Sequence, residues 1–125
     1  MNFHQGSSLY EHASANNLLA VRYMLNNGAN VNIRDNESGS TPLMTASWSN
    51  FYRVVRELLN HDGVNVNAQD GTGDTALMGA SLQGHWEVVF ELLNYPGVDV
   101  NIRNIDGETA LINAVMTSWK WFMSY

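Results

Sequence analysis

The segment Thr41-Pro42-Leu43-Met44-Thr45-Ala46 returns twice along the chain, as Thr75-Ala76-Leu77-Met78-Gly79-Ala80 and as Thr109-Ala110-Leu111-Ile112-Asn113-Ala114. The leucines of the three segments are evenly spaced, and one further step back by the same interval falls on Leu9. A constant interval of a few tens of residues is typical of proteins built from stacked structural repeats. The period therefore predicts a chain of similar units.

Two further blocks recur at matching offsets. One ends in a pair of leucines, at residues 56–59 and 90–93, with a weaker copy at 22–25. The other places a glycine before alternating apolar and polar residues, at 28–32, 63–67 and 97–101. Three blocks in a fixed order predict repeats at about 5–35, 36–69, 70–103 and 104–125, the last of them partial.

Each unit has the pattern of a helix, a turn, a second helix and a loop. The Thr41 hydroxyl can cap the first helix, and Pro42 suits the first helical position, where no amide donor is needed. In the second helix, apolar residues at 54, 55, 58 and 59 form one stripe. Glycines at 28, 63 and 97 suit a left-handed exit from the helix. One helix pair cannot bury its own stripe, so we expect neighbouring pairs to stack.

These residues resemble the ankyrin-repeat family from about Ser7 to Val115. The resemblance rests on three stretches: Gly39-Ser40-Thr41-Pro42-Leu43, Gly84-His85-Trp86-Glu87-Val88-Val89 and Asn27-Gly28-Ala29-Asn30-Val31-Asn32. It implies an all-α ankyrin-repeat solenoid, with helix-turn-helix units and projecting β-turn loops, as one domain over residues 1–125. Three repeats are full and the fourth is partial. The histidine that usually follows Thr-Pro-Leu in this family is replaced by Met44, Met78 and Ile112.

The C-terminal segment leaves no room for a full second helix after Ala114. Two interpretations stay open at this stage. The aromatic residues Trp119, Trp121 and Phe122 form a cap on the stack, or the chain is a piece of a longer repeat array.

Composition excludes several classes of protein. The chain has 125 residues, 45% of them hydrophobic, a formal net charge of −6, and no cysteine. One lysine and five arginines make no basic stripe for nucleic acid or anionic lipid, and the absence of cysteine excludes disulfides and thiolate chemistry. No apolar run reaches the length of a membrane span and the N-terminus is unlike a signal peptide, so we expect an intracellular, cytoplasmic monomer.

The candidates for catalysis and metal binding are weak. The four histidines are His4, His12, His61 and His85, and no two of them have the helical spacing of a zinc site. We interpret His85 as a capping or packing residue. Residues 71–76 fit the nucleotide-loop pattern G-x-G-x-x-A, but the sister repeats show an ordinary loop there. We therefore expect no catalytic residue, no metal and no cofactor.

The resemblance implies a protein-binding face on the concave side, made of loop tips and the exposed ends of the first helices. In this sequence the predicted partner-binding residues are Arg34, Glu37, Ser38, Ser40, Trp48, Ser49, Gln69, Thr72, Asp74, Leu82, Gln83, Arg103, Ile105, Asp106 and Glu108, with Met116 and Thr117 beside them.

Two features of this face point to the chemistry of the partner. Trp48, Leu82 and Met116 stand at matching offsets and predict an apolar line. The carboxylates of Glu37, Asp74, Asp106 and Glu108 favour a basic partner.

The resemblance favours a non-enzymatic protein–protein interaction module, or scaffold. The alternative is a regulatory or targeting part of a larger multi-domain ankyrin protein. Trp48 is the predicted anchor for the partner, because tryptophan is enriched among binding hot spots. In the competing interpretation Trp48 packs over Phe51 and Tyr52 within the stack.

Overall fold

The computed structural model describes residues 8–124, which form helices and no strand. The helices are α1 (Leu9–Ser14), α2 (Leu18–Asn26), α3 (Pro42–Trp48), α4 (Tyr52–Leu59), α5 (Ala76–Gln83), α6 (Trp86–Leu93) and α7 (Ala110–Met123). His4, Tyr125 and positions 5–7 of the first predicted repeat lie outside the described residues. The predicted all-α solenoid, with three helix pairs and a partial fourth unit, is confirmed.

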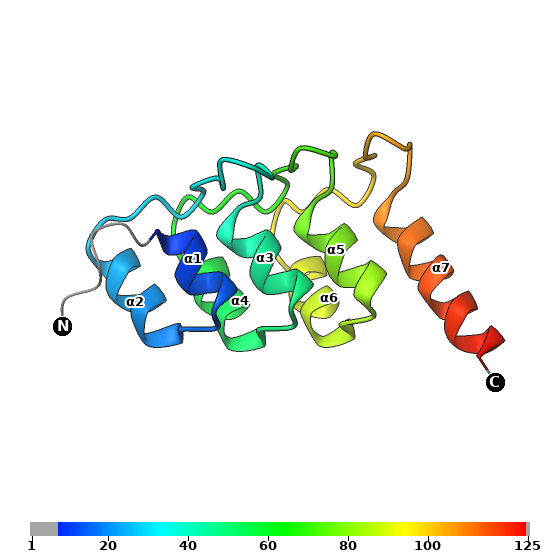
Figure 1. Ribbon diagram of the computed structural model, residues 1–125, viewed down its shortest axis with the longest axis horizontal. Helices are drawn as coiled ribbons and strands as arrows, with labels where there is room; N and C mark the ends of the chain where they lie inside the picture. The colour runs from blue at the N-terminus through cyan, green and yellow to red at the C-terminus, as the bar shows by residue number, and fades with distance from the viewer. Residues whose placement is uncertain (1–7, 125) are drawn as a thin grey trace.

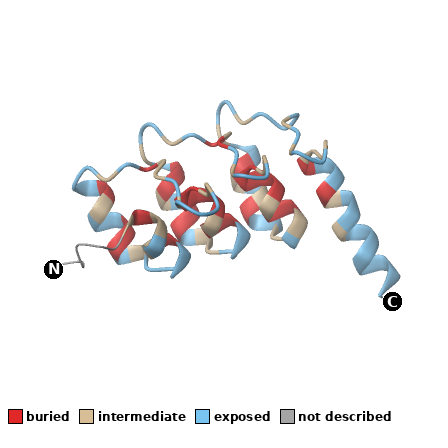
Figure 2. Ribbon diagram, turned by 45° about the horizontal axis from the view of Figure 1, so that its top comes forward, coloured by how far each residue is buried: buried red, intermediate tan, exposed pale blue. Residues whose placement is uncertain are grey.

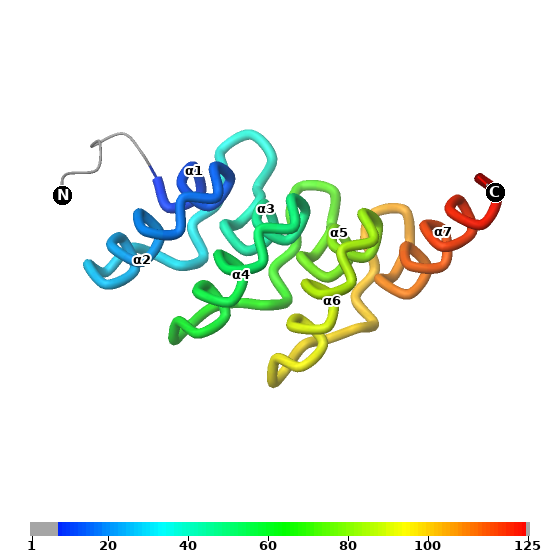
Figure 3. Tube along the Cα trace, turned by 90° about the horizontal axis from the view of Figure 1, so that it is seen from below, coloured from blue at the N-terminus to red at the C-terminus, as the bar shows by residue number. Residues whose placement is uncertain are grey.

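The helices form two rows. The first helices α1, α3, α5 and α7 lie side by side, and α2, α4 and α6 form the second row beside them (Figure 1, Figure 3). The loops between pairs project together from one edge of the stack (Figure 1). Each paired helix therefore contacts its own partner and the matching helix of a neighbouring unit.

The helix starts follow from the repeated hydroxyl residues. Ser8, Thr41, Thr75 and Thr109 each accept a hydrogen bond from the backbone amide three residues later, at 3.1 to 3.3 Å. Pro42 occupies the first turn of α3. The predicted cap at Thr41 is confirmed, and the same device begins every helix of the first row.

The core lies between the two rows, where Figure 2 shows the buried residues. The predicted stripe of the second helix is confirmed, because residues 54, 55, 58 and 59 are all buried. Gly63, after α4, has a φ of 87°, a left-handed conformation that favours glycine. The predicted left-handed exit is found at Gly28 and Gly97 as well.

Asparagine side chains join neighbouring units at the foot of the second row. The Asn32 Nδ2 donates to the Gly63 carbonyl (2.8 Å), and its Oδ1 accepts from the Asn65 amide (2.7 Å). One repeat later, Asn67 makes the same pair of bonds to the Gly97 carbonyl and the Asp99 amide. These paired bonds fix the spacing of the units and explain the repeated asparagine.

The turn inside each helix pair depends on one residue that recurs at the same position of the repeat. Asn16, Asn50 and Gly84 occupy the same position in successive repeats and all have positive φ, which ends the first helix and starts the turn. The next position in this series is Ser118, which continues α7 instead. Asparagine and glycine tolerate the left-handed region much better than serine does. The fourth unit therefore continues as one long helix.

The aromatic residues of α7 do not form the cap that one interpretation predicted. Trp119, Trp121 and Phe122 are exposed. Leu111 is 72% exposed, although the matching Leu43 and Leu77 are 2% and 4% exposed. Those leucines belong to complete helix pairs, and residues 8–124 supply no second helix for α7.

Replacement of Asn67 by alanine tests the asparagine links between units. We expect Asn67→Ala to lower the free energy of unfolding by about 1–2 kcal/mol, because two hydrogen bonds between repeats are lost. Asn94→Ala is the control, since within residues 8–124 the Asn94 side chain binds only a carbonyl of its own helix end, and it should change stability by less than about 0.5 kcal/mol. Urea denaturation of both variants measures the difference. Equal effects would contradict this role for Asn67.

Hydrogen exchange tests the uneven stability of the stack. We expect backbone amides after Thr117 to exchange much faster than those of α5, because every residue from 118 to 124 is exposed. The Thr117 hydroxyl still binds the Leu82 carbonyl (2.7 Å), so the protected part of α7 should end near that residue. Equal protection of residues 118–124 and α5 would show that the end of α7 is covered in solution.

Candidate functional site

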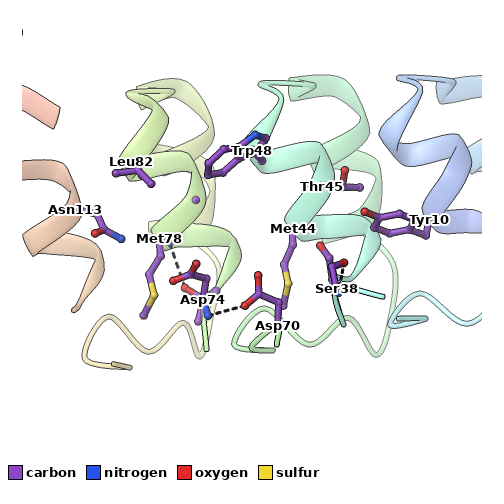
Figure 4. Close-up of a pocket in the computed structure, with 13 residues that line it drawn as sticks. Tyr10, Ser38, Met44, Thr45, Trp48, Asp70, Asp74, Met78, Leu82 and Asn113 are labelled. Carbon is purple, nitrogen blue, oxygen red and sulfur yellow. Dashed lines mark hydrogen bonds between the residues drawn. The ribbon is translucent and has the colours of Figure 1, made fainter. Parts of the chain in front are cut away.

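A groove of about 250 Å³ runs along the first-row helices (Figure 4). Helices of all four units contribute to it, from α1 to α7. Its lining residues are Tyr10, Ser38, Ser40, Met44, Thr45, Trp48, Asp70, Asp74, Thr75, Met78, Gly79, Leu82 and Asn113.

Helix geometry explains which positions reach the groove. On α3 these are Met44, Thr45 and Trp48, at i, i+1 and i+4, which share one side of a helix. On α5 the matching positions, one repeat later, are 78, 79 and 82. Equivalent positions of successive repeats therefore line up along the groove, and each repeat contributes a different side chain at them.

Trp48 lies across the boundary between two units. A side chain added at Gly79 of α5 would begin 3.3 Å from the Cε3 atom of the Trp48 ring, so the ring lies directly over Gly79. The tryptophan is still 49% exposed. Its ring packs against the next repeat, which differs from the predicted alternative of packing over Phe51 and Tyr52.

The side chain of His85 forms a hydrogen bond with the backbone of Trp48. Its Nε2 donates to the Trp48 carbonyl oxygen at 3.0 Å, at the C-terminal end of α3. No side-chain cap is made by His85 at the start of its own helix α6. Of the two roles predicted for His85, capping or packing, the side chain therefore does not cap α6, and it links the end of α3 to the next unit.

Two aspartates supply the charge of the groove. Asp70 Oδ1 accepts from the Thr72 amide (3.0 Å), the Thr72 hydroxyl (3.0 Å) and the Asp74 amide (2.9 Å). Asp74 accepts from the Thr72 hydroxyl and from Asn104 Nδ2. These bonds hold both carboxylates at the foot of α3 and α5 (Figure 4). No lysine or arginine is among the lining residues, so the formal charge of the groove is negative.

Asn113 is the lining residue that α7 contributes. It is only 4% exposed, and Figure 4 shows its side chain extending from α7 toward α5. Within residues 8–124 its amide group makes no hydrogen bond, whereas its backbone carbonyl accepts from the Thr117 hydroxyl. The oxygen and nitrogen of this amide are not among the fully buried side-chain atoms that lack a partner in the described chain, so the amide is accessible from the groove.

Five of the predicted partner-binding residues line this groove: Ser38, Ser40, Trp48, Asp74 and Leu82. Met116 is not among the lining residues, so only Trp48 and Leu82 of the predicted apolar line meet there. Gln83 and Thr117 instead line a second hollow with Trp86 and Trp121.

Three predicted residues bind loop backbone. Arg34 donates to the carbonyls of Gly39 (2.8 Å) and Gln69 (2.7 Å), and Gln69 donates to those of Gly73 and Arg103. Arg103 donates to the Gly107 carbonyl (2.8 Å). These bonds stabilise each loop and join it to the next one. The structure of the loops alone therefore explains why these residue types stand at these positions.

The remaining predicted residues lie on the loops or at helix ends. Thr72 binds both groove aspartates, and Glu108 accepts from Asn104 Nδ2 at 3.0 Å. The others are exposed and stay predictions for the rim: Glu37, Ser49, Ile105 and Asp106.

Sequence reasoning missed most of the groove floor, namely Tyr10, Met44, Thr45, Asp70, Thr75, Met78, Gly79 and Asn113. The repeat period could have found six of these residues, because they fall at two adjacent repeat positions. One position holds Tyr10, Met44 and Met78, and the next holds Thr45, Gly79 and Asn113. Asp70 also has counterparts, because Asp35 and Asn104 open the equivalent loops and accept bonds from amides of those loops.

The loop that carries Ser38 is fixed by Asp35. Its Oδ2 accepts from the Ser38 amide (2.9 Å) and the Ser38 hydroxyl (2.8 Å). The bond from the Ser38 amide is the largest cause that lowers the pKa of Asp35 below its ordinary value, followed by the bond from the hydroxyl. The folded state therefore favours the ionised carboxylate.

In the described range, no three His, Asp or Glu side chains gather as a metal ion would require. No helix between residues 8 and 124 is both long enough and apolar enough to cross a bilayer.

Comparison with known families gives matches over most of the chain. A model of ankyrin repeats in three copies matches residues 4–70, and a model of ankyrin repeats in many copies matches residues 58–114. Proteins with such repeats are generally protein–protein interaction modules and are typically non-enzymatic. No curated protein gives a significant match.

The Asp35 carboxylate predicts a pH dependence of stability. A lowered pKa in the folded state means that its contribution is present at neutral pH and is lost as the pH falls through the folded-state pKa. We expect Asp35→Asn to lower the melting temperature near pH 7 and to have little effect near pH 2. Asp62→Asn is the control, because the exposed Asp62 side chain makes no hydrogen bond in the described part of the chain. A deficit of the Asp35 variant that is the same at both pH values would contradict the assignment.

Proposed function

Since this chain belongs to the ankyrin-repeat family, we propose that it is a non-enzymatic module that binds a protein partner in the groove along α1, α3, α5 and α7. The observation that supports this proposal is the exposure of Trp48, a large aromatic residue that lines the groove and is half exposed. Its ring is supported by Gly79 below and by the His85 bond to its carbonyl. A rigid, exposed indole loses little entropy when a partner covers it.

Charge adds a preference for the kind of partner. The chain has a formal net charge of −6, and both charged residues of the groove are aspartates. Opposite charge speeds encounter and disfavours acidic competitors, so a basic partner is proposed. The exposed carboxylates of Glu37 and Asp106 would extend this field at the rim.

We further propose that the module acts inside the cell and as a monomer. The chain has no cysteine, so it forms no disulfide of its own. The asparagine links and the apolar core hold its units together within one chain.

Trp48 has a matched control in Trp86, which is also 49% exposed but lies outside the groove, on α6. We expect Trp48→Ala to weaken partner binding at least about tenfold, because removal of a central aromatic anchor commonly costs about 2 kcal/mol or more. Trp86→Ala should leave binding unchanged. The measurement is quantitative mass spectrometry of proteins captured from lysate by the wild-type chain and by each variant.

Melting temperatures complete this experiment. Both variants should stay folded, since each removes a side chain that is half in solvent. Binding that survives Trp48→Ala, or a loss shared equally by the two variants, would contradict the proposal. A collapse of the melting temperature in Trp48→Ala alone would make Trp48 a framework residue.

A further inference from the structure

We infer that the groove recognises a peptide segment in which an arginine or lysine lies within about four positions of a large apolar residue. The basic side chain would meet Asp70 and Asp74, the apolar one would meet Trp48 and Leu82, and a main-chain amide would pair with Asn113. This inference rests on the proposed function and names the chemistry of the partner.

Asn113 is the observation that points to a ligand. Its amide offers a donor and an acceptor side by side, the residue is only 4% exposed, and the amide makes no hydrogen bond in the described chain although it lines the groove. The matching positions on the other helices are Thr45 and Gly79, so the repeat framework does not require an amide here. A peptide group carries the complementary acceptor and donor, which makes main chain a fitting partner.

The two aspartates specify the charge of the bound side chain. Every hydrogen bond that Asp70 accepts uses Oδ1, and its Oδ2 accepts none within residues 8–124. The arginines of the neighbouring loops, Arg34 and Arg103, donate to loop carbonyls rather than to these carboxylates. A guanidinium or ammonium group from a partner would complete the site. The same charges would repel the phosphates of a nucleic acid.

The spacing of the two features sets the length of the segment. Asp74 precedes α5 and Leu82 lies near its end, so the acidic and apolar parts are about 12 Å apart at a rise of about 1.5 Å per residue. An extended chain covers that distance in about four residues. Figure 4 shows this order, with the aspartates at one end of the groove and Trp48 and Leu82 at the other.

The test uses a phage library of random dodecapeptides, selected on the immobilised full-length chain. Enriched sequences are synthesised, and their Kd is measured by fluorescence anisotropy at low and high salt. The variants are Asp70→Asn combined with Asp74→Asn, which keeps the acceptor atoms of the loop but removes its charge, and Asn113→Leu. Asp62→Asn is the matched control for charge, because Asp62 lies outside the groove.

We expect the enriched peptides to share the basic and apolar pair, and added salt to weaken their binding. The double aspartate variant should weaken binding at least about tenfold, and Asp62→Asn should not. Asn113→Leu should weaken binding while the melting temperature holds, because the amide makes no hydrogen bond within residues 8–124 and leucine is of similar size. A purely structural asparagine would give the opposite result, a lower melting temperature with unchanged binding. If the leucine variant does not fold, Asn113→Thr, the residue found at position 45, replaces it in the same comparison.

The outcomes separate this inference from the proposed function. Peptides that need Trp48 but lack a basic residue, or that bind the aspartate and Asn113 variants as tightly as wild type, would overturn the inference and leave the proposed function standing. Peptides that are insensitive to Trp48→Ala, or no enrichment of any peptide, would overturn the inference and count against the groove itself.

Discussion

The helix pairs of this chain are too short to be stable alone, and the whole structure depends on their contact with neighbours. Helices α1 to α6 have six to nine residues, whereas isolated helices below about 12 residues are marginal in water. Burial of Leu43, Leu58 and Leu92 therefore requires the adjacent helices. The side-chain amides of Asn32 and Asn67 then fix the spacing between units that burial alone would leave loose.

The same stacking produces the groove. The first-row helices bury Met44 and Met78 in the core. Beside these methionines, Trp48 of α3 stays half exposed, and Leu82 holds the matching position on α5. The framework determines the positions of these side chains but not their identity. A tryptophan can therefore stand at 48, where α5 has Leu82, without disturbing the repeat.

The sequence allowed good prediction of the features that depend on a single repeat unit or on the repeat period. The caps, the buried stripes, the glycine exits and the place of Trp48 follow from local spacing. The place of the Asn113 amide in the groove could not be foreseen, because it depends on how α7 lies against α5. The long α7 could be traced to one residue, Ser118, in the place of Asn50 and Gly84, but only once the turns were seen to need positive φ.

One departure from stable local design lies in the groove. Gly79 stands inside α5, where glycine costs about 0.5–1 kcal/mol relative to alanine. Its missing side chain is the space that the Trp48 ring occupies, at 3.3 Å from the position of an added Cβ. Proteins commonly accept such local conflicts at functional sites. The half-exposed Trp48 ring, seated on Gly79, is the feature of this face that supports the proposed binding role.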